Sequence, residues 1–159
     1  MMNCESDPFS RPGIEQIAKR VSSVVAMTSS DKPIHSLGDE AFVSLTTFRR
    51  SGEPVSTAVW IARDGNDLVV ITPAESGKVK RIKNSGRVEL RPCNRGGKVP
   101  DGATAVAAEA RIVTGSAADR ATAILKKKYG FQYRLVMLIE RVIARRHKPR
   151  VILAISAAE

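Results

Sequence analysis

Residues 41–73 read AFVSLTTFRRSGEPVSTAVWIARDGNDLVVITP, and this stretch decides the fold. Three runs rich in β-branched and apolar residues are separated by two short polar segments, residues 49–53 and 65–66, and each segment contains a glycine. Because glycine and asparagine tolerate the positive φ of tight turns, both segments are typical of hairpins. The stretch therefore predicts an antiparallel meander with strands over residues 41–48, 54–64 and 67–73.

The segment after the meander mixes one short helix with two more strands. A basic helix is predicted over residues 76–84, where Val79 and Ile82 are spaced three apart and can face a core. Strands are predicted over residues 87–93 and 105–115, with a polar, glycine-containing loop between them.

Two helices and a strand complete the chain. The first helix begins near Ser116 and ends at Gly130, and the second covers residues 131–147 because Pro149 stops it. The run RVILAISA, residues 150–157, predicts a last strand covered on both faces. Six strands with few helices predict a mainly β fold with flanking helices (α+β), in the form of a six-stranded antiparallel split barrel. The second helix carries an apolar stripe that we expect to pack against the core: Leu135, Leu138, Ile139, Val142 and Ile143.

The beginning of the chain has a different composition, rich in proline, serine and charge. We interpret residues 1–36 as an N-terminal extension with one amphipathic helix, and residues 37–159 as the folded domain. Met27 is followed by a polar segment typical of the start of a domain, so residues 1–26 are interpreted as lying upstream of the true start. Mass spectrometry that finds natively expressed protein beginning at Met1 would refute this hypothesis.

Length and composition limit the protein class. A chain of 159 residues, 43% of them hydrophobic, has the size of one globular domain. No stretch approaches the roughly 20 apolar residues of a membrane span, and residues 1–12 are too polar for a secretory signal, so we expect a cytoplasmic protein. The two cysteines and two histidines are far apart in the sequence, which favours neither a disulfide framework nor a zinc site.

The net charge of +10 favours polyanionic partners. Two segments hold seventeen of the 26 cations: eight lie in residues 78–98 and nine in residues 126–150. A basic nucleic-acid-binding module is one alternative that fits this charge. Such a module needs exposed aromatic side chains for stacking, whereas most of the seven aromatic residues lie inside apolar runs or at helix ends, so nucleic acid is the weaker interpretation.

The helix over residues 76–84 has the pattern of a phosphate site. With Val79 and Ile82 toward the core, Lys78 and Arg81 share another face near the helix beginning. Unpaired backbone N–H groups and the positive end of the helix dipole lie at the same place, which suits a phosphate, and Lys80 can add charge at longer range. The alternative is an ordinary solvated basic helix face.

The second strand of the meander can accept a flat ring. Alternation places Ser56, Ala58 and Trp60 on one face and Thr57 and Val59 on the other. Small side chains allow a heterocycle to approach the backbone, and Trp60 can pack beside that ring or serve as a core or interface tryptophan.

Thr72 stands at the end of the third strand, before Pro73. Its hydroxyl can bond a ribityl or phosphate oxygen, or simply cap a turn.

No protein nucleophile with a base, carboxylate pair or His-containing triad is recognisable from the spacing of residues in the sequence. This pattern suits a redox protein in which a cofactor carries the chemistry and transfers a hydride to a small, electron-poor acceptor.

Three features together resemble the split-barrel flavin and deazaflavin oxidoreductases related to pyridoxamine-phosphate oxidase. The first is Val43-Ser-Leu-Thr-Thr-Phe48 followed by Ser56-Thr-Ala-Val-Trp60-Ile-Ala62. The second is Ile71-Thr72 running into Ser76-Gly-Lys-Val-Lys-Arg81. The third is Lys128-Tyr-Gly-Phe131 with Arg134. Within this superfamily the chain is similar to the branch that depends on coenzyme F420.

The resemblance implies an FMN-binding type of split barrel and a homodimer with the cofactor in a groove at the subunit interface. It implies coenzyme F420, a deazaflavin, as cofactor, with FMN as the alternative. Relatives also hold tetrapyrroles, so a non-catalytic split-barrel protein that binds FMN, haem or biliverdin stays open. No protein residue is assigned a catalytic role. The residues to which the family pattern assigns cofactor contacts are Ser56, Thr57, Ala58, Val59, Trp60, Ile71, Thr72, Ser76, Lys78, Lys80 and Arg81.

Two further segments carry open alternatives. The cations of residues 131–147 can steer the poly-glutamate tail of the deazaflavin coenzyme or form a solvated face. The loop over residues 94–98 can act as a lid over the groove or as a plain connection.

Overall fold

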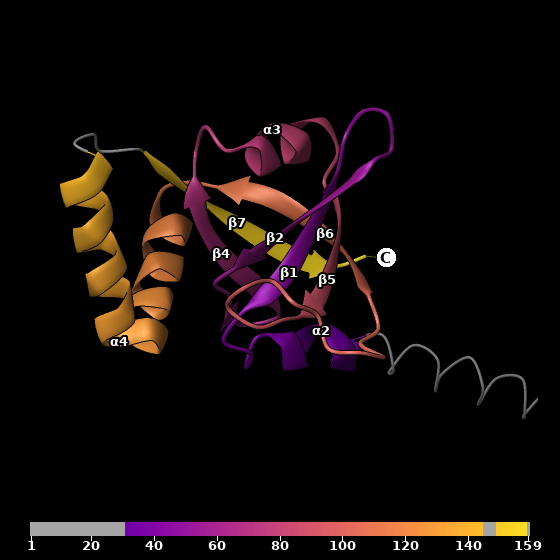
Figure 1. Ribbon diagram of the computed structural model, residues 1–159, viewed down its shortest axis with the longest axis horizontal. Helices are drawn as coiled ribbons and strands as arrows, with labels where there is room; N and C mark the ends of the chain where they lie inside the picture. The colour runs from indigo at the N-terminus through magenta and orange to yellow at the C-terminus, as the bar shows by residue number, and fades with distance from the viewer. Residues whose placement is uncertain (1–30, 145–148, 159) are drawn as a thin grey trace, which may run out of the picture.

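The computed structural model describes residues 31–144 and 149–158. The predicted amphipathic helix before residue 30 and the proposed start at Met27 lie outside the described residues. The fold is one curled sheet of seven antiparallel strands, with helices at its ends and along one side (Figure 1).

The elements follow the predicted order closely. The helices are α2 (Asp31–Leu37), α3 (Gly77–Asn84) and α4 (Ser116–Ala144). The strands are β1 (Val43–Phe48), β2 (Pro54–Val59), β3 (Ala62–Asp64), β4 (Asp67–Pro73), β5 (Arg87–Pro92), β6 (Val106–Val113) and β7 (Arg150–Ala157). In the sheet they lie in the order β2-β1-β5-β6-β7-β4-β3, and every neighbouring pair is antiparallel.

The prediction of six strands was too low by one, because the run over residues 54–64 divides into β2 and β3. The division falls at Trp60-Ile61, and the two halves lie at opposite edges of the sheet. The three Cα–Cα steps from Val59 to Ala62 span at most about 11 Å, whereas the edges of a flat seven-stranded sheet would lie about 29 Å apart. The sheet must therefore roll up, and the predicted barrel is confirmed.

Contacts from α4 explain why the strand breaks at this point. The Tyr129 hydroxyl accepts a hydrogen bond from the Ile61 N–H at 2.9 Å and lies 2.8 Å from the carbonyl oxygens of both Ala41 and Ile61. The Lys128 ammonium donates to the carbonyls of Gly38, Glu40 and Ile61 at 2.6–2.7 Å. Side chains thus satisfy the backbone of Ile61, which a continuous ladder would otherwise satisfy.

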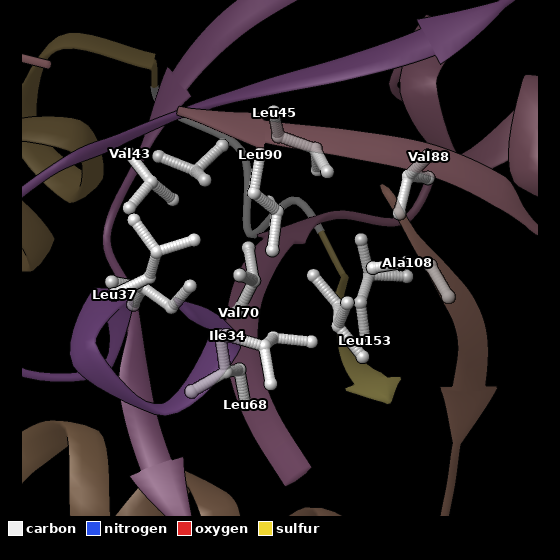
Figure 2. Close-up of a cluster of buried hydrophobic side chains, with 14 of the residues drawn as sticks. Ile34, Leu37, Val43, Leu45, Leu68, Val70, Val88, Leu90, Ala108 and Leu153 are labelled. Atoms are coloured by element: carbon white, nitrogen blue, oxygen red, sulfur yellow. The ribbon is translucent and has the colours of Figure 1, made fainter. Parts of the chain in front are cut away.

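Two apolar clusters hold the fold together. The larger one fills the barrel and includes Ile82 from α3. Figure 2 shows Ile34 and Leu37 from α2 in this cluster with inward-facing strand residues such as Leu90 and Leu153. The smaller one lies between α4 and the outside of the barrel, where Leu125 and Tyr129 pack against residues that include Ala62, Val69 and Ile152. Figure 1 shows α3 at one end of the barrel and α2 at the other.

The long helix α4 is two helices joined at Gly130, as predicted. Gly130 has φ 45° and ψ −115°, a conformation that glycine adopts without the steric cost of a Cβ. The two halves lie side by side along one flank of the barrel (Figure 1). In the second half, we expected the apolar stripe to pack against the core. This prediction was wrong for Leu135, Leu138 and Ile139, which are 42%, 58% and 44% exposed. The inward side of this half is instead formed by Tyr133 and Met137, and the side chains of Val142 and Ile143 lie outside the described part.

Candidate cofactor-binding site

The turn from β4 into α3 brings three predicted site residues into one hydrogen-bonded cluster. Thr72 is the penultimate residue of β4 and is 1% exposed. Its Oγ1 accepts a hydrogen bond from the Lys78 Nζ at 3.2 Å and lies 3.4 Å from the Ser76 Oγ. Ser76 occupies the N-cap position of α3, yet its hydroxyl makes no capping bond to the helix. The first N–H groups of α3 are therefore not capped by this side chain, as an anion site requires.

Arg81 lies one turn further along α3, and its side chain is hydrogen-bonded to a residue of β1. Its Nε donates to the Thr47 Oγ1 at 2.7 Å. Thr47 is 1% exposed, and its hydroxyl donates in turn to the Val55 carbonyl oxygen at 3.3 Å. A Cβ on Gly77 would lie 2.9 Å from the Arg81 Nη1, so the guanidinium lies directly against the first residue of the helix. This places two cations at the beginning of α3.

The electrostatics of this cluster favour an anion. Burial, followed by the nearby Arg81 charge, lowers the pKa of the Lys78 ammonium below its usual value. The first turn of α3 contains no acidic residue. A phosphate at this turn would offset the repulsion between the two cations and would receive both charged donors and helix N–H groups. We call Thr72, Ser76, Lys78 and Arg81 the phosphate cluster.

The predicted ring-binding strand, β2, lies at an edge of the sheet and pairs only with β1 among the described strands. Backbone groups on its outer side have no strand partner and can bond the edge of a heterocycle. The register places Ser56 beside Thr46, and their hydroxyl oxygens are 2.8 Å apart. Val59 is 7% exposed within the barrel core, whereas Thr57 is only half-buried.

The loop over residues 94–98 lies close to the small-residue face of β2. A Cβ on Gly97 would lie 3.7 Å from the Ala58 Cβ. The Asn94 side chain accepts hydrogen bonds from the backbone N–H groups of Gly96 and Lys98, both at 2.9 Å. The loop is thus a self-bonded turn next to the face where a flat ring was predicted to approach.

The remaining predicted contacts lie elsewhere. Trp60 stacks on Tyr129 with ring centroids 4.9 Å apart, and both Trp60 and Ile71 pack in the cluster between the barrel and α4. Lys80 is exposed on α3 and its carbonyl oxygen accepts a hydrogen bond from the Asn84 side chain. The structure therefore groups the phosphate cluster tightly, while Trp60 and Ile71 face α4.

Sequence reasoning missed Thr47 and Gly77. Both residues determine where the Arg81 guanidinium lies. The strand pattern could have indicated Thr47. Thr47 follows Val43 and Leu45 at alternate positions of the same strand face, and it is a polar residue on that inward-facing side. A buried hydroxyl at such a position needs a partner, although the sequence does not reveal which residue supplies it.

Comparison with known proteins agrees with this fold. The family model for pyridoxamine 5'-phosphate oxidase matches residues 31–159. No curated protein matched the chain in the sequence search.

Among the described residues, no helix is long and apolar enough to cross a membrane.

Three solved structures illustrate the similarity. A conserved hypothetical protein from Mycobacterium tuberculosis is 22% identical, with a TM-score of 0.54 over 77% of this chain and 76% of that chain. An F420 reductase is 20% identical, with a TM-score of 0.52 over 79% and 93%. The haem storage protein HutZ from Vibrio cholerae is 9% identical, with a TM-score of 0.54 over 80% and 87%. At these identities the structures support the fold alone. The family model, in contrast, covers every described residue, and the chain belongs to the pyridoxamine 5'-phosphate oxidase family.

Proposed function

We propose that this protein is a cytoplasmic oxidoreductase that binds coenzyme F420, or alternatively FMN, and transfers a hydride between the cofactor and a small electron-poor acceptor. The phosphate cluster is the observation that carries the proposal. It combines a partly buried lysine, an arginine and two hydroxyl groups at the beginning of a helix. Both cofactors carry a phosphate, and these donors match its oxygens in charge and in hydrogen-bonding type.

The residues around the cluster fit the remainder of such a cofactor. The unpaired outer side of β2, near Thr57 and Val59, supplies backbone donors and acceptors for the polar edge of a ring. The small side chains of Ser56 and Ala58 leave the backbone accessible from the other face of the strand. When bound, the flavin or deazaflavin ring supplies the hydride chemistry, and the protein binds, orients and shields it.

A homodimer is part of the proposal. An edge strand leaves a ring bound along β2 open to water on one side, and a second copy of the chain would cover it and complete a groove. The F420 reductase with the same fold supports the choice of the deazaflavin as the first cofactor to test.

The test is a titration of the purified protein with coenzyme F420 and, separately, with FMN. Saturable binding of one of them, followed by its absorbance and by Trp60 fluorescence, is the expected result. The double variant Lys78→Ala/Arg81→Ala should bind at least about 100-fold more weakly, because each charged hydrogen bond contributes about 1.5–3 kcal/mol. A matched variant, Arg63→Ala/Lys83→Ala, removes the same charge from exposed positions outside the predicted cofactor contacts and should bind normally. Equal weakening in both variants, or no binding by the wild type, would contradict the proposal.

Turnover separates an enzyme from a carrier. The reduced cofactor, bound to the protein, should pass its hydride to quinone or enone acceptors faster than the free reduced cofactor does. Tight binding without any acceleration would instead favour the non-catalytic alternative.

A further inference from the structure

The large apolar side chains that are exposed in the described residues all lie on the second half of α4. Phe131, Leu135, Leu138 and Ile139 are 75%, 42%, 58% and 44% exposed. Their spacing of i, i+4, i+7 and i+8 places them on a single face of the helix. They therefore form one continuous apolar strip, which we call the α4 outer face.

The opposite side of this helix segment is already occupied. Tyr133 is 8% exposed and lies beside Trp60 with ring centroids 6.1 Å apart, and Met137 packs in the same cluster. Packing against the barrel thus accounts for one apolar side of the helix only. A contiguous exposed apolar strip of this kind is typical of a surface that binds a partner.

Cations accompany the α4 outer face. Lys127 and Arg134 are exposed, and residues 126–139 contain no acidic residue. A second copy of the chain would bring the same cations against each other, and the net charge of +10 adds to this repulsion. A nucleic acid would match the charge but would offer no apolar partner for four large side chains. An anionic lipid surface matches both properties, because apolar side chains enter the acyl boundary while lysine and arginine remain at the headgroups.

We propose that the α4 outer face docks the protein on anionic lipid surfaces, with Phe131, Leu135, Leu138 and Ile139 inserted and with Lys127 and Arg134 at the headgroups. The contact is peripheral, with the helix lying in the plane of the interface. It does not depend on which cofactor the protein binds.

The experiment is co-sedimentation of the full chain with vesicles of phosphatidylcholine containing phosphatidylglycerol, and with vesicles of phosphatidylcholine alone. The wild type should sediment with the anionic vesicles, less so with the neutral ones, and less at high salt because screening weakens the charge attraction. The variant Phe131→Ser/Leu138→Ser should lose at least about tenfold in vesicle affinity, because two inserted side chains are removed.

A charge-matched pair separates docking from the general attraction of a basic protein. Lys127→Gln/Arg134→Gln should weaken vesicle binding several-fold more than Lys83→Gln/Arg95→Gln, which removes the same charge from exposed positions away from α4. Equal losses would overturn the proposal, since they would show that only net charge matters.

The oligomeric state tests the alternative that a second copy of the chain, and not a lipid surface, covers the α4 outer face. Sedimentation equilibrium should give the same oligomer for the wild type and for Phe131→Ser/Leu138→Ser, and an unchanged melting temperature would show that the variant is folded. If the wild type does not bind anionic vesicles and the variant dissociates, the α4 outer face is an interface between copies and the lipid proposal is wrong.

Discussion

Replacing Tyr129 with phenylalanine removes one oxygen atom from the point where β2 and β3 divide. The ring stays stacked on Trp60, so the change concerns the hydroxyl group alone. That hydroxyl accepts the Ile61 N–H and donates its single proton to the carbonyl of Ala41 or of Ile61. Ile61 is fully buried, and its N–H would lose its partner.

The expected cost follows from this unsatisfied donor. A buried N–H without a partner costs about 1–3 kcal/mol, and losing the bond donated by the hydroxyl adds up to about 1 kcal/mol. We expect Tyr129→Phe to lower the free energy of unfolding by about 2–3 kcal/mol. With a urea m-value of about 2 kcal/mol per molar, the unfolding midpoint should fall by about 1 M.

Urea denaturation followed by Trp60 fluorescence measures this loss. The control is Thr122→Val, which also removes a hydroxyl from α4, but one that is only partly buried and bonds within its own helix. This control should cost less than about 1 kcal/mol. If Tyr129→Phe costs less than about 0.5 kcal/mol, the hydroxyl does not hold the break between β2 and β3, and the explanation given for it is wrong.

Three further predictions concern the phosphate cluster and the core. FMN affinity should fall as the pH rises toward the ordinary lysine pKa of 10.5, because the lowered pKa of Lys78 makes its ammonium lose the proton earlier. Lys78→Arg should shift that decline to higher pH, and titrations at a series of pH values would contradict the reasoning if the two profiles coincided. Gly77→Ala should weaken FMN binding several-fold with little change in melting temperature, because the new Cβ displaces the Arg81 Nη1, which lies 2.9 Å from its position; unchanged affinity in a calorimetric titration would rule this out. Leu153→Ala should lower the free energy of unfolding by about 2–5 kcal/mol in urea, since Leu153 is fully buried in the barrel, and a loss below about 1 kcal/mol would show that it is not a core residue.

The sequence was sufficient to predict most of the fold because the barrel is built from local signals. Gly52 and Gly65 have φ of 86° and 63°, as the predicted hairpin turns require, and Gly130 marks the division of α4. The break at Trp60-Ile61 could not be predicted, because the local residues are good strand formers throughout. Its cause is a tyrosine that lies 68 residues further along the chain.

The candidate site shows the same limit. Thr72, Ser76 and Lys78 are close in sequence, and a helix beginning at that point brings them together. Thr47 lies 34 residues from Arg81, and only the folded barrel makes them neighbours. The exposure of the apolar stripe on α4 could not be predicted from the sequence either, since such a stripe has the same pattern whether it packs against the core or binds another surface.

The most direct test of the account compares FMN with riboflavin, which lacks the phosphate, as ligands of the wild type and of Lys78→Ala/Arg81→Ala. We predict that the wild type binds FMN at least about 100-fold more tightly than riboflavin, and that the double variant binds both with nearly the same weak affinity. If the variant keeps the full preference for FMN, the phosphate is bound elsewhere and the phosphate cluster is not the cofactor site.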